Sequence, residues 1–224
     1  MGSSIDDNDR RSTNCIKQSS YDRFEQYDEN GIIIYSYRQQ KGISCKKAFS
    51  VYNMNENEIG SFERISTACN CGFYRFNFYD ERKELKFYIE VNNNCCNTET
   101  FTFFGLDKNI ERTIKFKTDF CGITIEEYDK YGSKINTAIE ENECCSCSGS
   151  TYIEKDPEGN PIFIIKKISD CGRDTMKIYD YNRMEVNLND KNIFNEGFTK
   201  IQMILILRMF YDDQEGGSTT AGGD

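Results

Sequence analysis

The sequence predicts a mainly β domain: a closed antiparallel barrel of about twelve strands around one buried C-terminal helix. Three observations support this fold class: regularly spaced turn signals, apolar and polar residues alternating between them, and one uniformly apolar segment near the C-terminus. The 224 residues are enough for a single domain with a substantial core.

The composition favours strands over helices or disorder. The chain contains 16 Phe, 14 Tyr and only 2 Pro, and aromatic residues make up 13% of it. Aromatic and β-branched side chains pack well on a pleated sheet. A chain this rich in aromatic residues can bury enough apolar surface to fold.

Turn signals rich in Asp, Asn and Gly divide the chain into repeating units. Their first residues lie 22 to 27 positions apart. These residues are Asp28, Asn55, Asp80, Asp107, Asp129, Asp156 and Asp180. Asp and Asn start turns because their side chains accept hydrogen bonds from nearby backbone amides. A repeat of about 25 residues holds two strands and two turns, and six such repeats exceed what an open sheet usually carries.

Between the turns, apolar residues occupy every second position. Phe87, Ile89 and Val91 alternate with Tyr88 and Glu90 in this way. This period is typical of strands that bury one face.

The last predicted element is a helix of a different character. Residues 198–211 are apolar on nearly every face, and a helix of that kind is buried. Its length of about 21 Å suits a barrel interior but not a bilayer. We therefore expect a barrel over residues 31–212 with this helix at its centre, preceded by a polar acidic segment, 1–30, and followed by a Gly-rich polar tail, 213–224.

Charge and terminal sequence predict a cytoplasmic protein that does not bind nucleic acid. The net charge is −9, and no Lys/Arg run exceeds two residues, so the basic footprint of a nucleic-acid-binding protein is missing. Residues 1–13 lack the apolar stretch of a signal peptide. A membrane anchor is the alternative interpretation of residues 198–211, but Lys200 and Arg208 within them argue against it.

Several segments resemble, in order, the phospholipid scramblase family. The clearest is Cys71-Gly72-Phe73-Tyr74-Arg75, which is similar to the family's Cys-Gly-x-x-Arg segment. The other similar segments are residues 32–39, 48–53, 78–96, 144–147 and 162–167. The family is related to the Tubby-like fold, so the resemblance, which covers residues 32–211, implies a barrel around a central helix.

The chain departs from the family in its N-terminal region and in its cysteines. It lacks the proline-rich N-terminal region and has no Trp. Where relatives carry a long acylated cysteine run, this chain has only Cys95 and Cys96, and a second cluster contains Cys144, Cys145 and Cys147. The resemblance implies these five cysteines as candidates for palmitoylation.

The family's calcium segment corresponds to residues 179–189, and Ca²⁺ is the one cofactor that the resemblance implies. Only Asp180 and Asn182 supply side-chain oxygens at the alternating positions of this segment. Calcium takes six to eight oxygen ligands, so an ordinary strand, turn and strand also explains the segment.

The cysteine spacing predicts a sulfur-rich rim at one end of the barrel. Groups of cysteines precede the Asp turns by 8 to 11 residues, about one strand and a turn, which places them at the opposite end of a meander. The rim comprises Cys69, Cys71, Cys96, Cys121, Cys145 and Cys171. Four interpretations remain open: free thiols, acylation, disulfides and zinc binding.

The chain shows no pattern typical of an enzyme. It has no His for general-base chemistry, no Gly-rich phosphate loop and no Gly-x-Ser-x-Gly elbow. The acidic pair Glu126 and Glu127 is interpreted as a solvated strand end.

Two hypotheses for function follow. The first is a scramblase-like, non-enzymatic protein that associates with a phospholipid membrane surface on the cytosolic face and, as the resemblance implies, responds to calcium. The second is a self-assembling structural protein, a homo-oligomer or filament subunit, that reuses the fold and is cross-linked through its cysteines.

Overall fold

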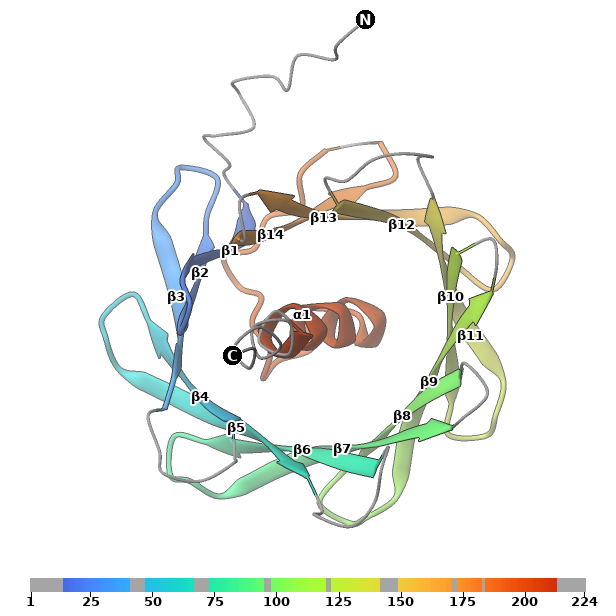
Figure 1. The fold of residues 1–224 in the computed structure, drawn as a ribbon, viewed down its shortest axis with the longest axis horizontal. Coiled ribbons are helices and arrows are strands. Elements are labelled where there is room, and N and C mark those ends of the chain that lie inside the picture. The colour runs from blue at the N-terminus through green and yellow to red at the C-terminus, as the bar shows by residue number, and fades with distance from the viewer. Residues whose placement is uncertain are drawn as a thin grey trace, which may run out of the picture.

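Fourteen antiparallel strands form a closed barrel around one helix in the computed structural model of the protein (Figure 1). The structure describes residues 14–40, 47–66, 73–94, 98–119, 122–141, 149–170, 173–182 and 184–212. The strands are β1 (Cys15–Ser20), β2 (Arg23–Tyr27), β3 (Ile33–Gln39), β4 (Lys47–Asn53), β5 (Glu58–Ser66), β6 (Phe73–Asp80), β7 (Leu85–Asn94), β8 (Thr98–Phe104), β9 (Ile110–Asp119), β10 (Gly122–Asp129), β11 (Lys134–Glu141), β12 (Gly149–Lys155), β13 (Pro161–Asp170) and β14 (Arg173–Asp180). The helix is α1 (Lys200–Asp212).

The barrel is an up-and-down meander. Each strand pairs with its neighbours in sequence, and β1 pairs with β14, with Ile16 opposite Met176, to close the ring. Closure leaves no strand edge unpaired. The predicted fold class, a closed antiparallel barrel with a buried C-terminal helix, is confirmed.

The strand number differs from the expected twelve because β1 and β2 lie within residues 1–30, which were expected to form a polar segment. The barrel therefore begins at Cys15, earlier than the expected boundary at residue 31. The alternation of apolar and polar residues does not reveal these two strands, because some of their buried positions carry polar side chains. Gln26 is fully buried, and its Nε2 donates to the carbonyl oxygens of Leu188, at 3.0 Å, and Lys191, at 2.6 Å.

Helix α1 begins with a reciprocal cap. The backbone N–H of Gln202 donates to Thr199 Oγ1, at 3.1 Å, and the N–H of Thr199 donates to Gln202 Oε1, at 3.3 Å. Such a capping box satisfies amides that the first helical turn leaves unpaired. It explains why the helix begins at Lys200, two residues after the expected start at Phe198.

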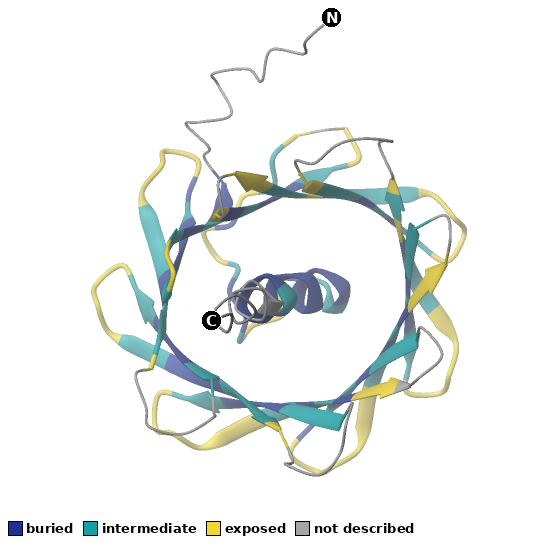
Figure 2. Ribbon diagram, in the orientation of Figure 1, coloured by how far each residue is buried: buried dark blue, intermediate teal, exposed yellow. Residues whose placement is uncertain are grey.

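The barrel and α1 share one core, and Figure 2 shows the buried residues of the strands and of the helix. The ring of Phe210, on α1, lies 4.4 Å from that of Phe24, 5.0 Å from Tyr37 and 5.6 Å from Phe49, measured between centroids. Side chains in the core therefore point inward from the wall and outward from the helix, and neither element could bury its apolar surface alone.

Six turns at one end of the barrel, which we call the turn rim, share one geometry. In the turn that begins at Asp129, the Asp129 N–H donates to the Ser133 carbonyl and the Gly132 N–H donates to the Asp129 carbonyl. The Asp129 carboxylate also accepts the N–H groups of Tyr131, at 2.9 Å, and Ser133, at 2.8 Å. The six turns span residues 28–32, 53–57, 80–84, 105–109, 129–133 and 156–160, and the segment after β14 begins in the same way at Asp180. Two of them start two residues before their predicted position, at Asn53 and Gly105.

The fourth residue of every such turn has a positive φ. Three turns place glycine there, Gly31, Gly132 and Gly159, whereas the others place Glu56, Lys83 and Lys108 at φ of 59°, 63° and 60°. This left-handed backbone conformation destabilises a residue that has a Cβ, because the Cβ comes close to the carbonyl oxygen, whereas glycine adopts it without that cost.

We therefore predict that Lys108→Gly stabilises the protein by about 0.5–1 kcal/mol. The reason is that glycine removes the steric cost of the left-handed backbone. Chemical denaturation measures the change. Lys108→Ala is the control, since it removes the charge but keeps the Cβ; an equal gain in the alanine variant would contradict the explanation.

Candidate functional site

A cavity with a volume of about 940 Å³ opens at the turn rim. The residues around it come from the β8–β9 turn, the β10–β11 turn and the segment leading into α1. They are Phe104, Asp107, Lys108, Asn109, Ile110, Glu111, Arg112, Lys130, Tyr131, Glu196 and Lys200. We call it the rim cavity.

Charged side chains of both signs line the rim cavity. Four are cationic (Lys108, Arg112, Lys130 and Lys200) and three are anionic (Asp107, Glu111 and Glu196). Two hydrogen bonds from Asn109 to the Asp107 carboxylate lower the pKa of that group, so Asp107 stays charged. Of the four cations, only Arg112 forms an ion pair within the described part of the chain, with its Nε 3.5 Å from Glu127 Oε1.

A pair of buried carboxylates lies inside the barrel, next to the start of α1. Glu154, on β12, is fully buried, and Glu127, on β10, is 3% exposed. Glu154 Oε2 accepts hydrogen bonds from Thr199 Oγ1 and Gln202 Nε2, each at 3.2 Å, while its Oε1 is buried without a hydrogen-bond partner. The same two residues that cap the helix thus also hold Glu154.

Burial raises the pKa of both carboxyl groups. For Glu154, desolvation outweighs the hydrogen bonds from Thr199 and Gln202, and the negative charge of Glu127 adds to the effect, so that its pKa rises to about 7. Desolvation likewise raises the pKa of Glu127, although Asn136, Arg112 and Lys200 oppose the shift. A proton therefore binds to this pair more strongly than to a carboxylate in water.

The acidic pair Glu126–Glu127 is not a solvated strand end, as its sequence had suggested. The two side chains point to opposite faces of β10, because successive residues of a strand alternate. Glu126 pairs with Lys117, with Nζ 2.6 Å from Oε2, on the outer wall, and Glu127 lies inside.

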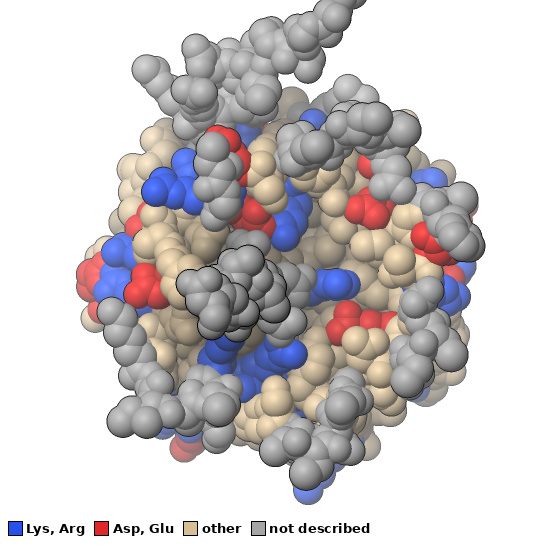
Figure 3. Space-filling model, in the orientation of Figure 1, with Lys and Arg blue, Asp and Glu red and all other residues tan. Residues whose placement is uncertain are grey.

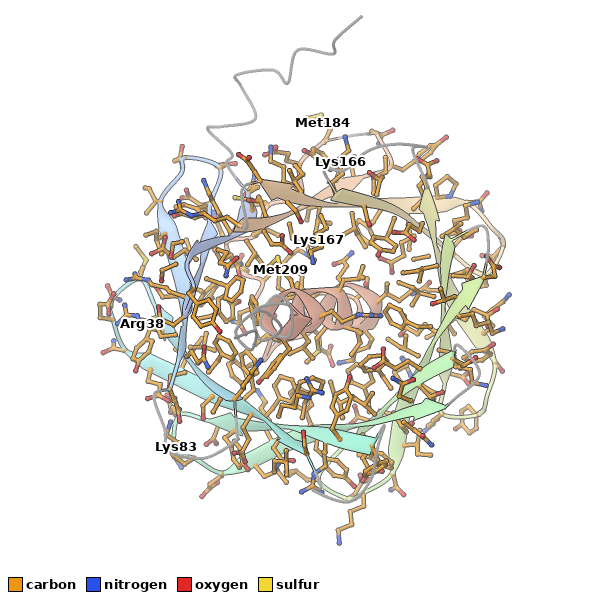
Figure 4. All side chains as sticks on the ribbon, viewed as in Figure 1. Arg38, Lys83, Lys166, Lys167, Met184 and Met209 are labelled. Atoms are coloured by element: carbon orange, nitrogen blue, oxygen red, sulfur yellow. The ribbon has the colours of Figure 1, made fainter. Side chains whose placement is uncertain are left out.

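The opposite end of the barrel interior carries a second charged network around the end of α1. Arg208, on α1, lies 3.5 Å from Glu99, which accepts a 2.7 Å hydrogen bond from the Tyr74 hydroxyl. Lys167 points from β13 into the barrel, whereas its neighbour Lys166 points outward (Figure 4). Lys167 Nζ lies 2.5 Å from Asp174 Oδ2. Cations and anions both lie on the face in Figure 3.

Large exposed apolar side chains gather at the turn rim. Of the ten that the described residues contain, eight belong to its turns or to the residues next to them. These eight are Ile32, Met54, Leu85, Leu106, Ile110, Tyr131, Tyr181 and Met184. The hairpin tips that bear them splay outward around the barrel, as Figure 2 shows by their exposed ends.

The calcium candidates Asp180 and Asn182 lie at this rim too. Asp180 Oδ1 accepts the N–H of Met184 at 3.0 Å. The Asp129 carboxylate accepts the N–H of Ser133 in the same way, four residues further along the chain. Within the described ranges, no group of three or more acidic or cysteine side chains is close enough to hold a metal ion. Calcium binding stays a prediction.

The cysteine candidates cannot be placed in the same way. The lipidation candidates Cys95, Cys96, Cys144, Cys145 and Cys147, and the predicted rim of Cys69, Cys71, Cys96, Cys121, Cys145 and Cys171, lie outside the described residues. The strands on either side of these segments all end at the end of the barrel opposite the turn rim. Cys15, buried at the start of β1, is the one cysteine among the described residues.

Neither protein-family models nor curated proteins match this chain. The one helix in the described part of the chain is too short to cross a bilayer.

Sequence reasoning missed the pair of buried carboxylates, and the chain offered one signal for it. Both glutamates stand two residues before the aspartate that starts a turn, Glu127 before Asp129 and Glu154 before Asp156. That position faces the barrel interior.

We predict that Glu154→Gln removes a pH dependence of stability. With a pKa of about 7 in the folded state and 4.5 as its ordinary value, Glu154 binds a proton between these pH values that the unfolded chain releases. The stability of the wild type should therefore fall as the pH rises from about 4.5 to about 7, and the variant should be more stable at pH 8 by about 1–3 kcal/mol.

Denaturation at pH 5 and pH 8 measures this difference. Glu126→Gln is the matched control: its neighbours Lys117 and Tyr128 lower the pKa of Glu126 against the effect of burial, so it should give no gain at pH 8. A wild-type stability that rises between pH 5 and pH 7, with no difference in the Glu154 variant, would show that the carboxyl is not neutral in the fold.

Proposed function

We propose that the protein is a non-enzymatic, peripheral protein of scramblase type that associates with phospholipid surfaces through its turn rim, on the cytosolic face of the membrane. The observation that carries this proposal is the gathering of eight exposed large apolar side chains at one end of the barrel. Apolar side chains that project from one end of a protein can insert into the interfacial region of a bilayer. The barrel around a central helix agrees with the fold that the scramblase resemblance implies.

The chemistry of these side chains suits a membrane interface. Tyr131 and Tyr181 combine an apolar ring with a polar hydroxyl, and Met54 and Leu106 stand at turn tips, 65% and 66% exposed. Such residues enter the headgroup region of a bilayer, where lysines keep their charged ends in water. Three lysines, Lys83, Lys108 and Lys130, lie in turns of the same rim.

The charge of the rim selects among lipids. Backbone N–H groups lower the pKa of Asp28, at the first position of its turn, and Asn160 does the same for Asp156, so both stay ionised at neutral pH. Together with the net charge of −9, they oppose an anionic surface. The proposal is therefore binding to zwitterionic lipid, with calcium strengthening binding to anionic lipid.

Flotation with phosphatidylcholine vesicles tests the rim. Removing two of the apolar tips, with Leu106→Ser and Tyr131→Ser together, should weaken binding about tenfold or more, because each tip loses its transfer from water to the interface. The matched control is Tyr21→Ser with Ile139→Ser, which removes the two large exposed apolar side chains that the described residues place away from the turn rim. Equal losses in both double variants would contradict docking through this rim.

A second arm, with phosphatidylserine vesicles, tests the calcium response. Calcium should increase binding, and Asp180→Asn should abolish the increase. Asparagine preserves the turn, since Asn53 starts an equivalent turn and its Oδ1 accepts hydrogen bonds from the N–H groups of Asn55 and Asn57. Sedimentation of the same samples detects self-association. Assembly without vesicle binding would contradict the proposed lipid association and support the hypothesis of a self-assembling structural protein.

A further inference from the structure

The rim cavity and the buried carboxylates are connected through two side chains. Arg112 and Lys200 line the cavity, and both act electrostatically on Glu127 inside the barrel. Glu127 in turn acts on Glu154, which is held by Thr199, the residue before Lys200. The positive charge in the cavity wall is therefore partly balanced by a pair of carboxylates that can take up a proton.

The cavity wall has the chemistry of an oxyanion site. Lys108, Lys130 and Lys200 join Arg112 around one space, and the rings of Tyr131 and Phe104 supply apolar walls. Lys130 lies against the Tyr131 ring, with Nζ 4.9 Å from its centroid, which orients its ammonium without neutralising it. Of the three acidic side chains, Asp107 is engaged by Asn109, and Glu111 packs over Gly105.

We propose that the rim cavity binds a phosphate-type oxyanion and that its binding is coupled to protonation of the Glu127–Glu154 pair. The inference goes beyond lipid association and does not depend on it: a free anion in solution would fill the same site.

The direction of the coupling follows from charge. When the pair carries two negative charges, it offsets the field of Arg112 and Lys200, and an incoming anion is bound weakly. When the pair takes up a proton, that offset shrinks and the anion is bound more tightly. By linkage, anion binding must raise the proton affinity of the pair to the same extent.

The surroundings of Glu154 leave Glu127 as its main charged neighbour. Beside it in the sheet are Ala138 on β11 and Phe163 on β13, which carry no charge. From α1 it faces Thr199 and Gln202. Glu127 faces a second set of groups: Asn136 on β11, Arg112 on β9 and Lys200 on α1. The raised pKa of Glu154, about 7, places the transition within the physiological range.

The test is an NMR titration of the full chain with sodium sulfate at pH 5.5 and at pH 8.5, without vesicles. Sulfate keeps its charge of −2 throughout, so any change in affinity belongs to the protein. We expect sulfate to shift the amide signals of Asn109 and Tyr131 and to bind about tenfold more tightly at pH 5.5. A parallel titration with monomeric dihexanoylphosphatidylglycerol distinguishes a lipid headgroup from a free anion as the source of the oxyanion.

Two variants separate the site from its coupling. Glu154→Gln should bind with little dependence on pH, because this position stays neutral throughout. Lys130→Ala should lose about tenfold in affinity at both pH values while keeping the difference between them. Circular dichroism confirms that each variant is folded.

The outcomes are distinguishable. Coupled binding of sulfate, or of the short-chain lipid alone, supports the proposal and identifies the source. Binding of neither probe, equal affinity at both pH values, or an undiminished pH dependence in Glu154→Gln overturns it. Failure here would leave vesicle docking through the apolar tips untouched, because the flotation test measures binding to phosphatidylcholine vesicles and not anion binding by Lys130 or protonation of Glu154.

Discussion

The enclosure of α1 is the constraint on which the structure depends. Its apolar side chains point in every direction, and a segment of that kind is stable in water only where a wall surrounds it. The barrel provides this wall, and the ring of Phe210 packs among aromatic residues from β2, β3 and β4. Closing the sheet around a helix removes the unpaired strand edges, and the helix fills the interior of the barrel.

Enclosure has a consequence for polar groups. The helix begins inside the barrel, so its first amides and the buried carboxylates beside them need partners within the protein. Thr199 and Gln202 satisfy the amides at the start of the helix and also donate hydrogen bonds to Glu154. Gln26 donates a hydrogen bond to the carbonyl of Leu188, in the segment that leads into the helix. Glu154 is buried with its Oε1 unpaired, so its ionised form destabilises the fold. Buried ionisable groups of this kind cluster at functional sites.

The sequence allowed the barrel and its central helix to be predicted because both depend on local patterns. Strands such as β7 alternate strictly, and residues 198–211 are apolar throughout. The first two strands were missed because Gln18 and Gln26 are buried, and only the fold shows which distant carbonyl groups a buried glutamine can reach. A further repeat signal was present at four of the turns, where a tyrosine precedes the aspartate: Tyr27-Asp28, Tyr79-Asp80, Tyr128-Asp129 and Tyr179-Asp180.

The candidate site was harder to predict, for a physical reason. The residues that line the rim cavity come from three separate segments, and their charges of both signs look like an ordinary solvated surface in the sequence. Glu127 and Glu154 stand near the ends of β10 and β12, where a glutamate looks solvated in the sequence, and their burial depends on which face of the sheet turns inward. By contrast, the calcium and palmitoylation candidates came from the resemblance, and the cysteine rim came from the spacing of the cysteines.

Hydrogen exchange of α1 tests the central claim most directly. If the barrel encloses the helix, the amides of residues 204–211 should exchange only on global unfolding, as slowly as those of the central strands, and adding vesicles should not change their rate. Fast exchange of these amides in the folded protein, or a change in their protection when lipid is added, would contradict the enclosure and with it the account of the site.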